Sequence, residues 1–452
     1  MQKGIKMHLD KAMLVALVTL AWPTVVEQLL STIVQYIDTA MVGQLGAEAT
    51  ATISLSSTYT WLLNSIMSSA GIGFLAYVAR AIGEKNEYKV RRAAGQAVMV
   101  VLVVGVILTG ITLVAAPYMP IWMGAEEVIH KDASVYFALI NLPLVFRAAI
   151  LIFGAVLRST GDTKTPMYIN VLVNICNMLL NYVFIYALDF GAIGAGIATA
   201  ISFLLGGILM TIAFIRNKTI AFQLGYAKLE WKILRDILKI GIPVMMTSIV
   251  SCSGYIVATS FVSSMATTIY AAHSIAITAE TIFYIPGYGI QAATSTLVGN
   301  ALGENNKKKQ RDVSLISMGI IFVTMSITGL LLFLSAEMMM GLFTKDTQVI
   351  QIGADLLRIV AFSEPIFGSA AVMEGIYNGL GRTKYPFVVE LVTRWGIRIF
   401  GSFLCVRIFD FGIHSIWYCM IADNVIKAGL LVIGLRNIYL KRYDSSHSVM
   451  SK

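Results

Sequence analysis

Charged residues are scarce in this chain. Asp, Glu, Lys and Arg make up 13% of its 452 residues, whereas soluble globular proteins carry about 25%. Apolar runs of about 20 residues, each long enough to span a bilayer as a helix, recur from end to end with short polar stretches between them. The composition therefore excludes a soluble globular protein and predicts a polytopic membrane protein.

Catalytic motifs are absent as well. The five histidines lie near the ends of apolar runs or in the tails, and the sequence has no His-Glu-x-x-His, Gly-x-Ser-x-Gly or Walker pattern. A membrane-embedded enzyme is therefore disfavoured, and without an ATP-binding loop any pumping has to draw on an ion gradient. The four cysteines fall within apolar runs without metal-ligand spacing, and we expect buried structural thiols there.

The net charge of +9 does not indicate nucleic-acid binding, because Lys and Arg gather in alternate connections between the apolar runs. The other connections hold almost none. This distribution follows the positive-inside rule and predicts that both termini are cytoplasmic. We expect a multi-pass protein of the plasma (cytoplasmic) membrane that contacts the lipid bilayer, binds no nucleic acid and is a monomer.

The apolar runs predict an all-α fold of twelve transmembrane helices. We expect these helices at residues 13–41, 50–78, 94–116, 134–157, 167–188, 193–215, 238–263, 274–301, 314–336, 356–378, 387–408 and 414–436. The predicted organisation is an amino-terminal lobe at 1–215, a cytoplasmic linker at 216–237, a carboxyl-terminal lobe at 238–436 and a cytoplasmic tail at 437–452. Alternating charge around Trp231 predicts an interfacial amphipathic helix in the linker.

Four sequence elements recur at a nearly constant offset and indicate an internal repeat. The pairs Pro23 and Pro243, Gly83 and Gly303, and Gly161 and Gly381 are each 220 residues apart, and the two Asp-Phe-Gly turns are 221 apart. Each half then holds six spans, an even number, so the halves are parallel repeats about an axis along the membrane normal. Two such halves suit alternating access.

A carboxylate, Asp38, falls within the first apolar run. A charge in hydrocarbon costs about 3 kcal/mol or more, so Asp38 should face protein or a water-filled cavity. Pro23 removes one helical hydrogen bond and frees the carbonyl of Thr19, which predicts a bend. A bendable helix with a titratable group is a plausible moving part. The alternative is that Asp38 lies near the outer interface and is only solvated.

These anchors, together with the stretches from Asp38 to Gly46 and from Leu297 to Gly303, resemble the multidrug and toxic compound extrusion (MATE) family over roughly Leu14 to Arg436. The resemblance is to DinF- and NorM-like members with a cation site in the amino lobe. It implies two pseudo-symmetric parallel six-helix lobes in a V shape. It also implies a secondary antiporter without a cofactor, which exports cationic, amphipathic organic molecules against a sodium or proton gradient.

The resemblance also implies which residues form the amino-lobe cation site. Asp38 matches the acidic residue of the family's first helix, Asn177 a family asparagine and Thr199 a family threonine. Asn181 falls where many members have aspartate, and Asn174 lies two turns before it. Together they offer hard oxygen ligands that suit Na+. Alternatively the asparagines are interhelical hydrogen bonders, and proton coupling through Asp38 alone is equally possible.

The carboxyl lobe departs from this pattern. The repeat register puts Ala258 opposite Asp38 and Gly401 opposite Asn181. The seventh span has no acid, and the aligned position of the tenth, near Phe367, is apolar. A NorM-type site in the carboxyl lobe is therefore doubtful, and we expect coupling to lie in the amino lobe.

Other ionisable residues in the spans need partners. The expected pairs are Glu280 with Arg394 or Arg398, Glu27 with Arg147, and Asp423 with Lys427 four residues on. The alternative for Glu27 and Glu280 is a place in the central cavity. The candidates for substrate contact are Glu27, Gln35, Tyr36, Met245, Glu280 and Tyr284, because carboxylates and aromatic faces attract organic cations and Met adapts its shape. Packing is the alternative for the aromatic residues and Met.

A flippase for lipid-linked oligosaccharide, with a related fold, is the alternative function. It would need a cluster of cavity arginines to bind pyrophosphate. Arg147, Arg394 and Arg398 are too few and too scattered to indicate one. The sequence therefore favours multidrug efflux, and it names neither the coupling ion nor the physiological substrate.

Overall fold

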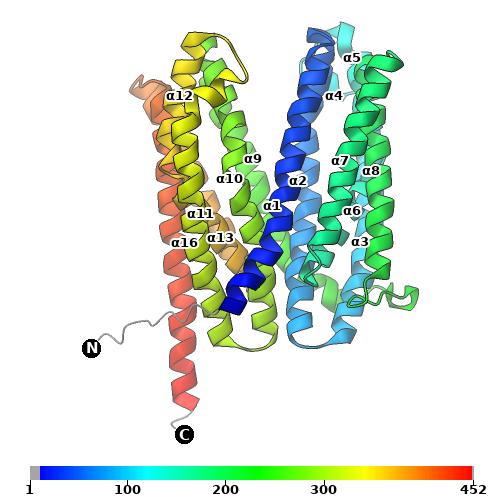
Figure 1. Cartoon of the computed structure of the whole chain (residues 1–452), viewed down its shortest axis with the longest axis vertical. Coiled ribbons are helices and arrows are strands. Elements are labelled where there is room, and N and C mark those ends of the chain that lie inside the picture. Colours follow the sequence, from blue (N-terminus) through cyan, green and yellow to red (C-terminus); the bar gives the residue numbers. More distant parts are fainter. Residues whose placement is uncertain (1–10, 450–452) are drawn as a thin grey trace. The chain divides into compact units, whose positions relative to one another are not determined.

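The computed structural model describes residues 11–449, without the side chains of residues 47, 58 and 440–449 (Figure 1). The first half of the chain forms α1 (Lys11–Gly43), α2 (Ala47–Gly83), α3 (Glu87–Ala115), α4 (Met119–Trp122), α5 (Glu127–Asn141), α6 (Leu144–Ser159), α7 (Lys164–Tyr182), η1 (Val183–Ala187) and α8 (Gly191–Arg216). The second half forms η2 (Leu224–Tyr226), α9 (Trp231–Ser263), α10 (Thr267–Gly303), α11 (Lys307–Gly341), α12 (Thr347–Ala361), α13 (Glu364–Gly379), α14 (Lys384–Thr393), η3 (Arg394–Ile399), α15 (Phe400–Phe403), η4 (Leu404–Ile408) and α16 (Ile413–Val449).

The all-α prediction is confirmed, and each predicted span coincides with one helical segment. Helices satisfy all backbone polar groups internally, which hydrocarbon requires. Two of the segments are bent, α5–α6 by 43° and α12–α13 by 55°. Within the described residues, eight single helices are long and apolar enough to cross a membrane, or up to ten when each bent pair counts as one span.

The internal repeat is visible in the backbone of the turns. Positive φ angles recur at Gly161 and Gly381, with values of 89° and 67°. They also recur in the tight turns at Lys85 and Asn305 (52° and 53°) and at Asp189 and Asp410 (54° and 52°). The two halves therefore turn in the same way at equivalent positions.

The central connection differs from its prediction. Residues 217–230 hold only the short 3-10 turn η2, and the helix expected around Trp231 forms the first turns of α9 and not a separate linker helix. The connection lies against α3 instead. The Gln96 side chain donates to the carbonyl of Lys228 at 2.7 Å and accepts from the Glu230 amide at 3.3 Å. The backbone of this connection therefore bonds to a side chain of α3 and not along a helix of its own.

The chain divides into two compact units, and the division passes through two helices. One unit is Val26–Ser248, and the other joins the chain up to Val25 with the chain from Ile249 onward. Ile233 and Ile237 of α9 are buried in the core of the first unit, formed largely by α2, α3, α6 and α8. Leu17 and Ala21 of α1 are buried in the core of the second, formed by α10, α11, α13 and α16.

The predicted lobe boundaries at 215 and 238 follow the sequence repeat, whereas the compact units are divided inside α1 and α9. Pro23 lies two residues before the first division, and Pro243 lies five residues before the second. Each unit therefore contains one half of α1 and one half of α9.

Candidate functional site

The second half of α1 is hydrogen-bonded to α7 at a constant register. The pairs are Glu27–Asn170 at 2.8 Å, Ser31–Asn174 at 2.9 Å and Asp38–Asn181 at 2.8 Å, each 143 residues apart. Asparagines at positions 170, 174, 177 and 181 share one face of α7 because residues three and four apart are neighbours on a helix. This periodicity lines up a row of amides opposite the polar positions of α1.

Asp38 lies at the end of this row and belongs to a chain of hydrogen bonds across three helices. The Asn181 amide donates to Asp38 Oδ1 and also contacts Asn177 Oδ1 at 3.3 Å. The Asn177 amide in turn contacts Thr199 Oγ1 on α8 at 3.4 Å. The structure thus brings together Asp38, Asn181, Asn177 and Thr199. Asn174 bonds to Ser31 and lies outside the chain.

Two features of this cluster leave it open to a cation. Asn181 is 2% exposed, and its Oδ1 has no hydrogen-bond partner within residues 11–449. In the same part of the chain, Asp38 forms no ion pair with a basic side chain. A buried polar atom without a partner and a carboxylate without a counter-charge both cost free energy in an apolar medium. A proton on Asp38, or a small cation among these oxygens, would relieve that cost.

The atoms of this cluster that could bind a cation are all oxygens. No group of three or more His, Cys, Asp or Glu side chains in the described chain could hold a metal ion, so the ligands of a transition-metal site are missing there. One carboxylate, two amides and one hydroxyl are ligands for a hard cation. A π-helical turn, η1, begins two residues after Asn181, and such turns are frequent at functional sites.

Glu27 lies eleven residues before Asp38, and its partner differs from the prediction. Arg158 Nη2 lies 2.7 Å and 2.9 Å from its two carboxylate oxygens, and Asn170 supplies a further donor. The predicted pair with Arg147 is therefore wrong. Arg147 instead lies over the ring of Phe203, 4.6 Å from its centroid.

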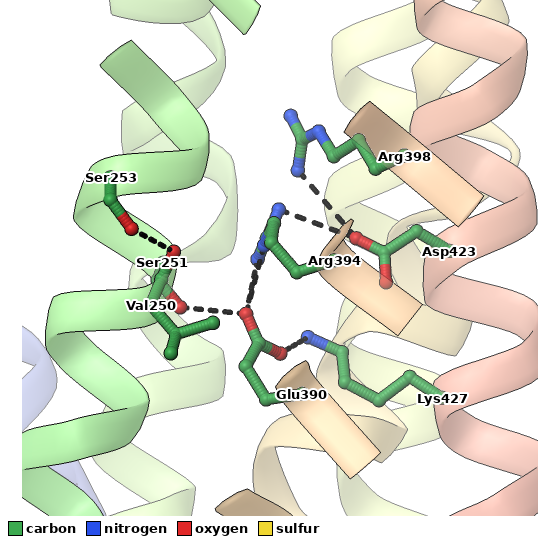
Figure 2. A network of polar contacts seen from close by, with 8 residues as sticks. All are labelled: Val250, Ser251, Ser253, Glu390, Arg394, Arg398, Asp423 and Lys427. Carbon is green, nitrogen blue, oxygen red and sulfur yellow. Dashed lines mark hydrogen bonds and ion pairs between the residues drawn. The ribbon is translucent and has the colours of Figure 1, made fainter. Parts of the chain in front are cut away.

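A second buried network lies in the unit that contains Ile249–Lys452 (Figure 2). Its centre is Glu390 on α14, which accepts from Ser251 at 2.6 Å, from Arg394 Nε at 2.8 Å and from Lys427 at 2.9 Å. Asp423 lies 3.3 Å from Arg394 and 3.9 Å from Arg398. The predicted pair of Asp423 with Lys427 is therefore wrong, because the two side chains of α16 bind different partners on the neighbouring segment.

The predicted pair of Glu280 with an arginine is not a direct ion pair, although the charge of Arg398 acts on Glu280. Glu280 is 9% exposed and forms no ion pair within 4 Å in the described chain, because Arg394 and Arg398 face Asp423. Both arginines lie in the π-helix η3. A π-helical turn changes the phase of a helix, and here it turns these side chains toward α16.

The other candidates for substrate contact lie in separate units. Gln35 is exposed and Tyr36 partly buried on α1, and Met245 is partly buried on α9, all within Val26–Ser248. Tyr284 belongs to the other unit, where its ring packs against Phe367 at 5.3 Å. Their contact with substrate stays a prediction. Pro23 is buried within the continuous helix α1, and the predicted bend stays a prediction too.

Sequence reasoning missed the partners of the buried acids. Asn170, Ser31 and Arg158 were not identified, although Asn170 begins the same i, i+4 series as Asn174. That periodicity was a usable signal. No comparable signal existed for Glu390, whose role depends on which sides of α14 and α16 meet.

Comparison with known proteins places the chain. A family model described as MatE matches residues 23–183 and 243–404. The chain is 28% identical over 423 residues to the probable multidrug resistance protein NorM of Thermotoga maritima, covering 92% of this chain and 91% of that protein. It is 23% identical to the probable multidrug resistance protein YoeA of Bacillus subtilis, covering 87% of each.

Solved structures agree on the fold. An outward-facing multidrug resistance MATE family transporter of the MOP superfamily superimposes with a TM-score of 0.91 at 21% identity, covering 95% of this chain and 96% of that chain. A MATE crystallised in complex with MaL6 superimposes with a TM-score of 0.90 at 22% identity, covering 95% and 97%. The chain therefore belongs to the MatE family of multidrug and toxic compound extrusion transporters.

Proposed function

We propose that this transporter exports organic, mostly cationic and amphipathic compounds in antiport with Na+ or H+, and that Asp38 is the exchange site. Membership of the MatE family makes the chain a multi-pass multidrug efflux transporter and not an enzyme. The coupling proposal rests on one observation: Asp38 lacks an ion pair in the described chain and is hydrogen-bonded to Asn181, whose own Oδ1 has no partner there.

The physical reason for exchange is the cost of a desolvated charge. An ionised Asp38 in the membrane favours uptake of a proton or Na+, which neutralises it. Binding of a proton or Na+ also changes how Asp38 accepts the hydrogen bond from the Asn181 amide. That bond is one of the three between α1 and α7. Release of the cation on the other side of the membrane would then accompany alternating access of the two halves.

The positions of Lys and Arg in the connections support one orientation of the transporter in the membrane. We place both termini in the cytoplasm and the chain in the cytoplasmic membrane, because Lys and Arg gather in alternate connections. The protein would work as a monomer on small organic cations and without a cofactor.

Drug export is supported over lipid-linked oligosaccharide flipping. Relatives at full length are named multidrug resistance proteins. Three arginines of the spans also face carboxylates, Arg158 against Glu27 and Arg394 and Arg398 against Asp423, while Arg147 lies over the ring of Phe203. The paired guanidinium groups are not free to bind a pyrophosphate.

Transport in proteoliposomes tests the proposal. Ethidium efflux would be measured with a sodium gradient or a pH gradient imposed separately, and Asp38→Asn should abolish the gradient-driven part while folding and insertion persist. The matched control is Asp189→Asn, the same change at an exposed turn residue, which should transport normally. Full activity of Asp38→Asn would remove Asp38 from the mechanism, and the gradient that drives efflux identifies the coupling ion.

A further inference from the structure

Two of the four cysteines lie against each other in the unit that contains Ile249–Lys452. Cys405 belongs to η4 and Cys419 to α16, and the two thiols are close enough to interact electrostatically. Both are free thiols and partly exposed. A Cβ atom built on Gly401, one turn before Cys405, would lie 3.2 Å from the sulfur of Cys419. The side chain of Cys419 therefore points at the face of the helix that carries Cys405.

The fold produces this contact in two ways. The tight turn at Asp410, with a φ of 52°, returns the chain so that α16 packs beside η4. The amide of Phe411 also donates to the carbonyl of Cys405 at 2.8 Å, which fixes the end of η4 to the turn. Gly401 leaves the space into which the Cys419 sulfur projects.

The repeat shows what these thiols replace. At the offset of 220, which holds up to the Asp-Phe-Gly turn, Gly401 corresponds to Asn181 and Cys405 to Ile185. At the offset of 221, which holds after that turn, Cys419 corresponds to Ala198. In the unit Val26–Ser248, Asn181 belongs to the candidate cation site, whereas Ile185 and Ala198 are apolar. In the other unit a glycine takes the place of that asparagine, and two thiols take the places of the two apolar side chains.

We propose that Cys405 and Cys419 form a redox-active dithiol that a two-electron oxidant converts to an intramolecular disulfide. With hydrogen peroxide, two S–H bonds and the O–O bond break, one S–S bond and two O–H bonds form, and two molecules of water leave. With a disulfide oxidant, successive thiol–disulfide exchange oxidises the pair and reduces the oxidant to two thiols. Thiols on two segments that pack against each other need little reorganisation to react.

The disulfide would tie η4 to α16 around the turn at Asp410. It would close a short loop, from Cys405 to Cys419, and so constrain the unfolded chain. It would also hold the π-helical turn of η4 at one position relative to α16. We therefore expect the oxidised protein to be more resistant to thermal unfolding than the reduced protein.

Thiol counting on the purified full-length protein tests this inference. After treatment with hydrogen peroxide or diamide and denaturation, maleimide labelling should find two reactive thiols in place of four, and dithiothreitol should restore all four. Peptide mass spectrometry should find Cys405 linked to Cys419. Cys176→Ser and Cys252→Ser are the matched controls, and each should still lose two thiols on oxidation.

Cys405→Ser and Cys419→Ser should each keep three thiols after oxidation and show no rise in melting temperature. The wild-type protein alone decides the main point, so the result does not depend on how the variants fold. Four free thiols after oxidation, a bond to Cys252 or Cys176, or a bond between two molecules would overturn the inference.

Discussion

The amide of Asn181 combines two features that a carboxylate at this position could not supply together. Its nitrogen donates to Asp38, and its oxygen has no partner in the described chain. The nitrogen stabilises the charged form of Asp38, while the oxygen remains available as a ligand. One residue thus acts on both states of the exchange site, which makes it the sharpest place to separate the two candidate ions.

Asn181→Leu should change the cation dependence of efflux in a direction that depends on the ion. A hydrogen bond to a charged group contributes about 1.5–3 kcal/mol, which is about tenfold to a hundredfold in affinity. If Na+ is the ion, half-saturation should need that much more Na+, because a ligand is lost. If H+ is the ion, half-saturation should occur at a correspondingly lower proton concentration, because the charged form of Asp38 loses a hydrogen-bond donor. Ethidium efflux at graded Na+ and pH measures both.

Asn174→Leu is the control for Asn181→Leu. Asn174 lies on the same face of α7 but bonds to Ser31 and not to the Asp38 cluster. Equal shifts in the two variants would mean that the row of asparagines only packs α1 against α7, and that Asn181 has no separate role in cation binding.

Glu84 lies in the turn after α2, where a pH-dependent contribution to stability is expected. Partial burial alone would raise the pKa of Glu84, but hydrogen bonds and charges from Lys89 and Arg80 outweigh it and lower the pKa below its usual value. A lowered pKa stabilises the fold above the unfolded pKa of about 4.3. That stabilisation is lost as the pH falls through the folded value.

Glu84→Gln should therefore destabilise the protein by about 0.2–1 kcal/mol at pH 7, the range of solvent-exposed ion pairs. The difference from wild type should shrink toward zero as the pH falls below 4. Thermal unfolding in detergent across this range measures it. Glu87→Gln, which changes a carboxylate that is 80% exposed, should have a smaller effect. A difference that is constant with pH would exclude the ionised Glu84 as its cause.

At the scale of helices, the connection 217–230 is fixed to α3 by two adjacent residues. Gln96 is fully buried and bonds to the backbone of the connection at Lys228 and Glu230. Gly95 has no Cβ, and one built there would clash with the carbonyl of Tyr226. The stretch that joins the two repeats is therefore anchored to the unit Val26–Ser248 and is not a free linker.

Gln96→Leu should lower the free energy of unfolding by about 1–3 kcal/mol, because two hydrogen bonds to the backbone of the connection are lost. It should also expose the bonds after Lys218 and Lys228 to trypsin in the native protein. Thermal unfolding and limited proteolysis measure the two effects. Gln348→Leu, at an exposed glutamine on α12, is the control. Unchanged cleavage in Gln96→Leu would mean that other contacts hold the connection.

For the whole molecule, the sequence predicted what depends on periodicity and missed what depends on helix rotation. The twelve segments and the repeated turns followed from apolar runs and from glycines at fixed offsets. Asp38 and Asn181 were paired because their positions match a family pattern. The direct partners of Glu27 and Asp423 were wrong and Glu280 has no direct ion pair in the described chain, because these contacts depend on which sides and which depths of neighbouring helices meet. The π-helix η3 changes the phase of Arg394 and Arg398, and no residue type signals such a turn.

The exchange of half-helices between the two sequence repeats was also beyond sequence reasoning. Each repeat begins with a long helix containing a proline, which suggested a bend within one lobe. In the structure, the stretch before each proline is buried with the other repeat: Leu17 and Ala21 with α10, α11 and α13, and Ile233 and Ile237 with α2, α3 and α6. Each sequence half is therefore incomplete without a segment of the other.

This incompleteness predicts how the chain behaves when it is cut in the connection 217–230. A fragment of residues 1–227 lacks the first half of α9, whereas a fragment of residues 1–248 contains all of the unit Val26–Ser248. Burying Ile233 and Ile237 contributes about 1.5–3 kcal/mol each. The longer fragment should therefore melt at a higher temperature in detergent, although the two differ by only 21 residues at one end.

Fragments 1–227 and 228–452 expressed together should associate, because each contains a half-helix that the other's core requires. They should co-purify through a tag on either one and restore ethidium efflux in proteoliposomes, whereas neither fragment alone should transport. Replacing Ile233 and Ile237 by Asn in the second fragment should weaken the association, since it places unpaired amides in the core of the first unit. If fragment 1–227 alone is as stable as fragment 1–248, the first half of α9 contributes nothing to that unit, and the two repeats fold independently.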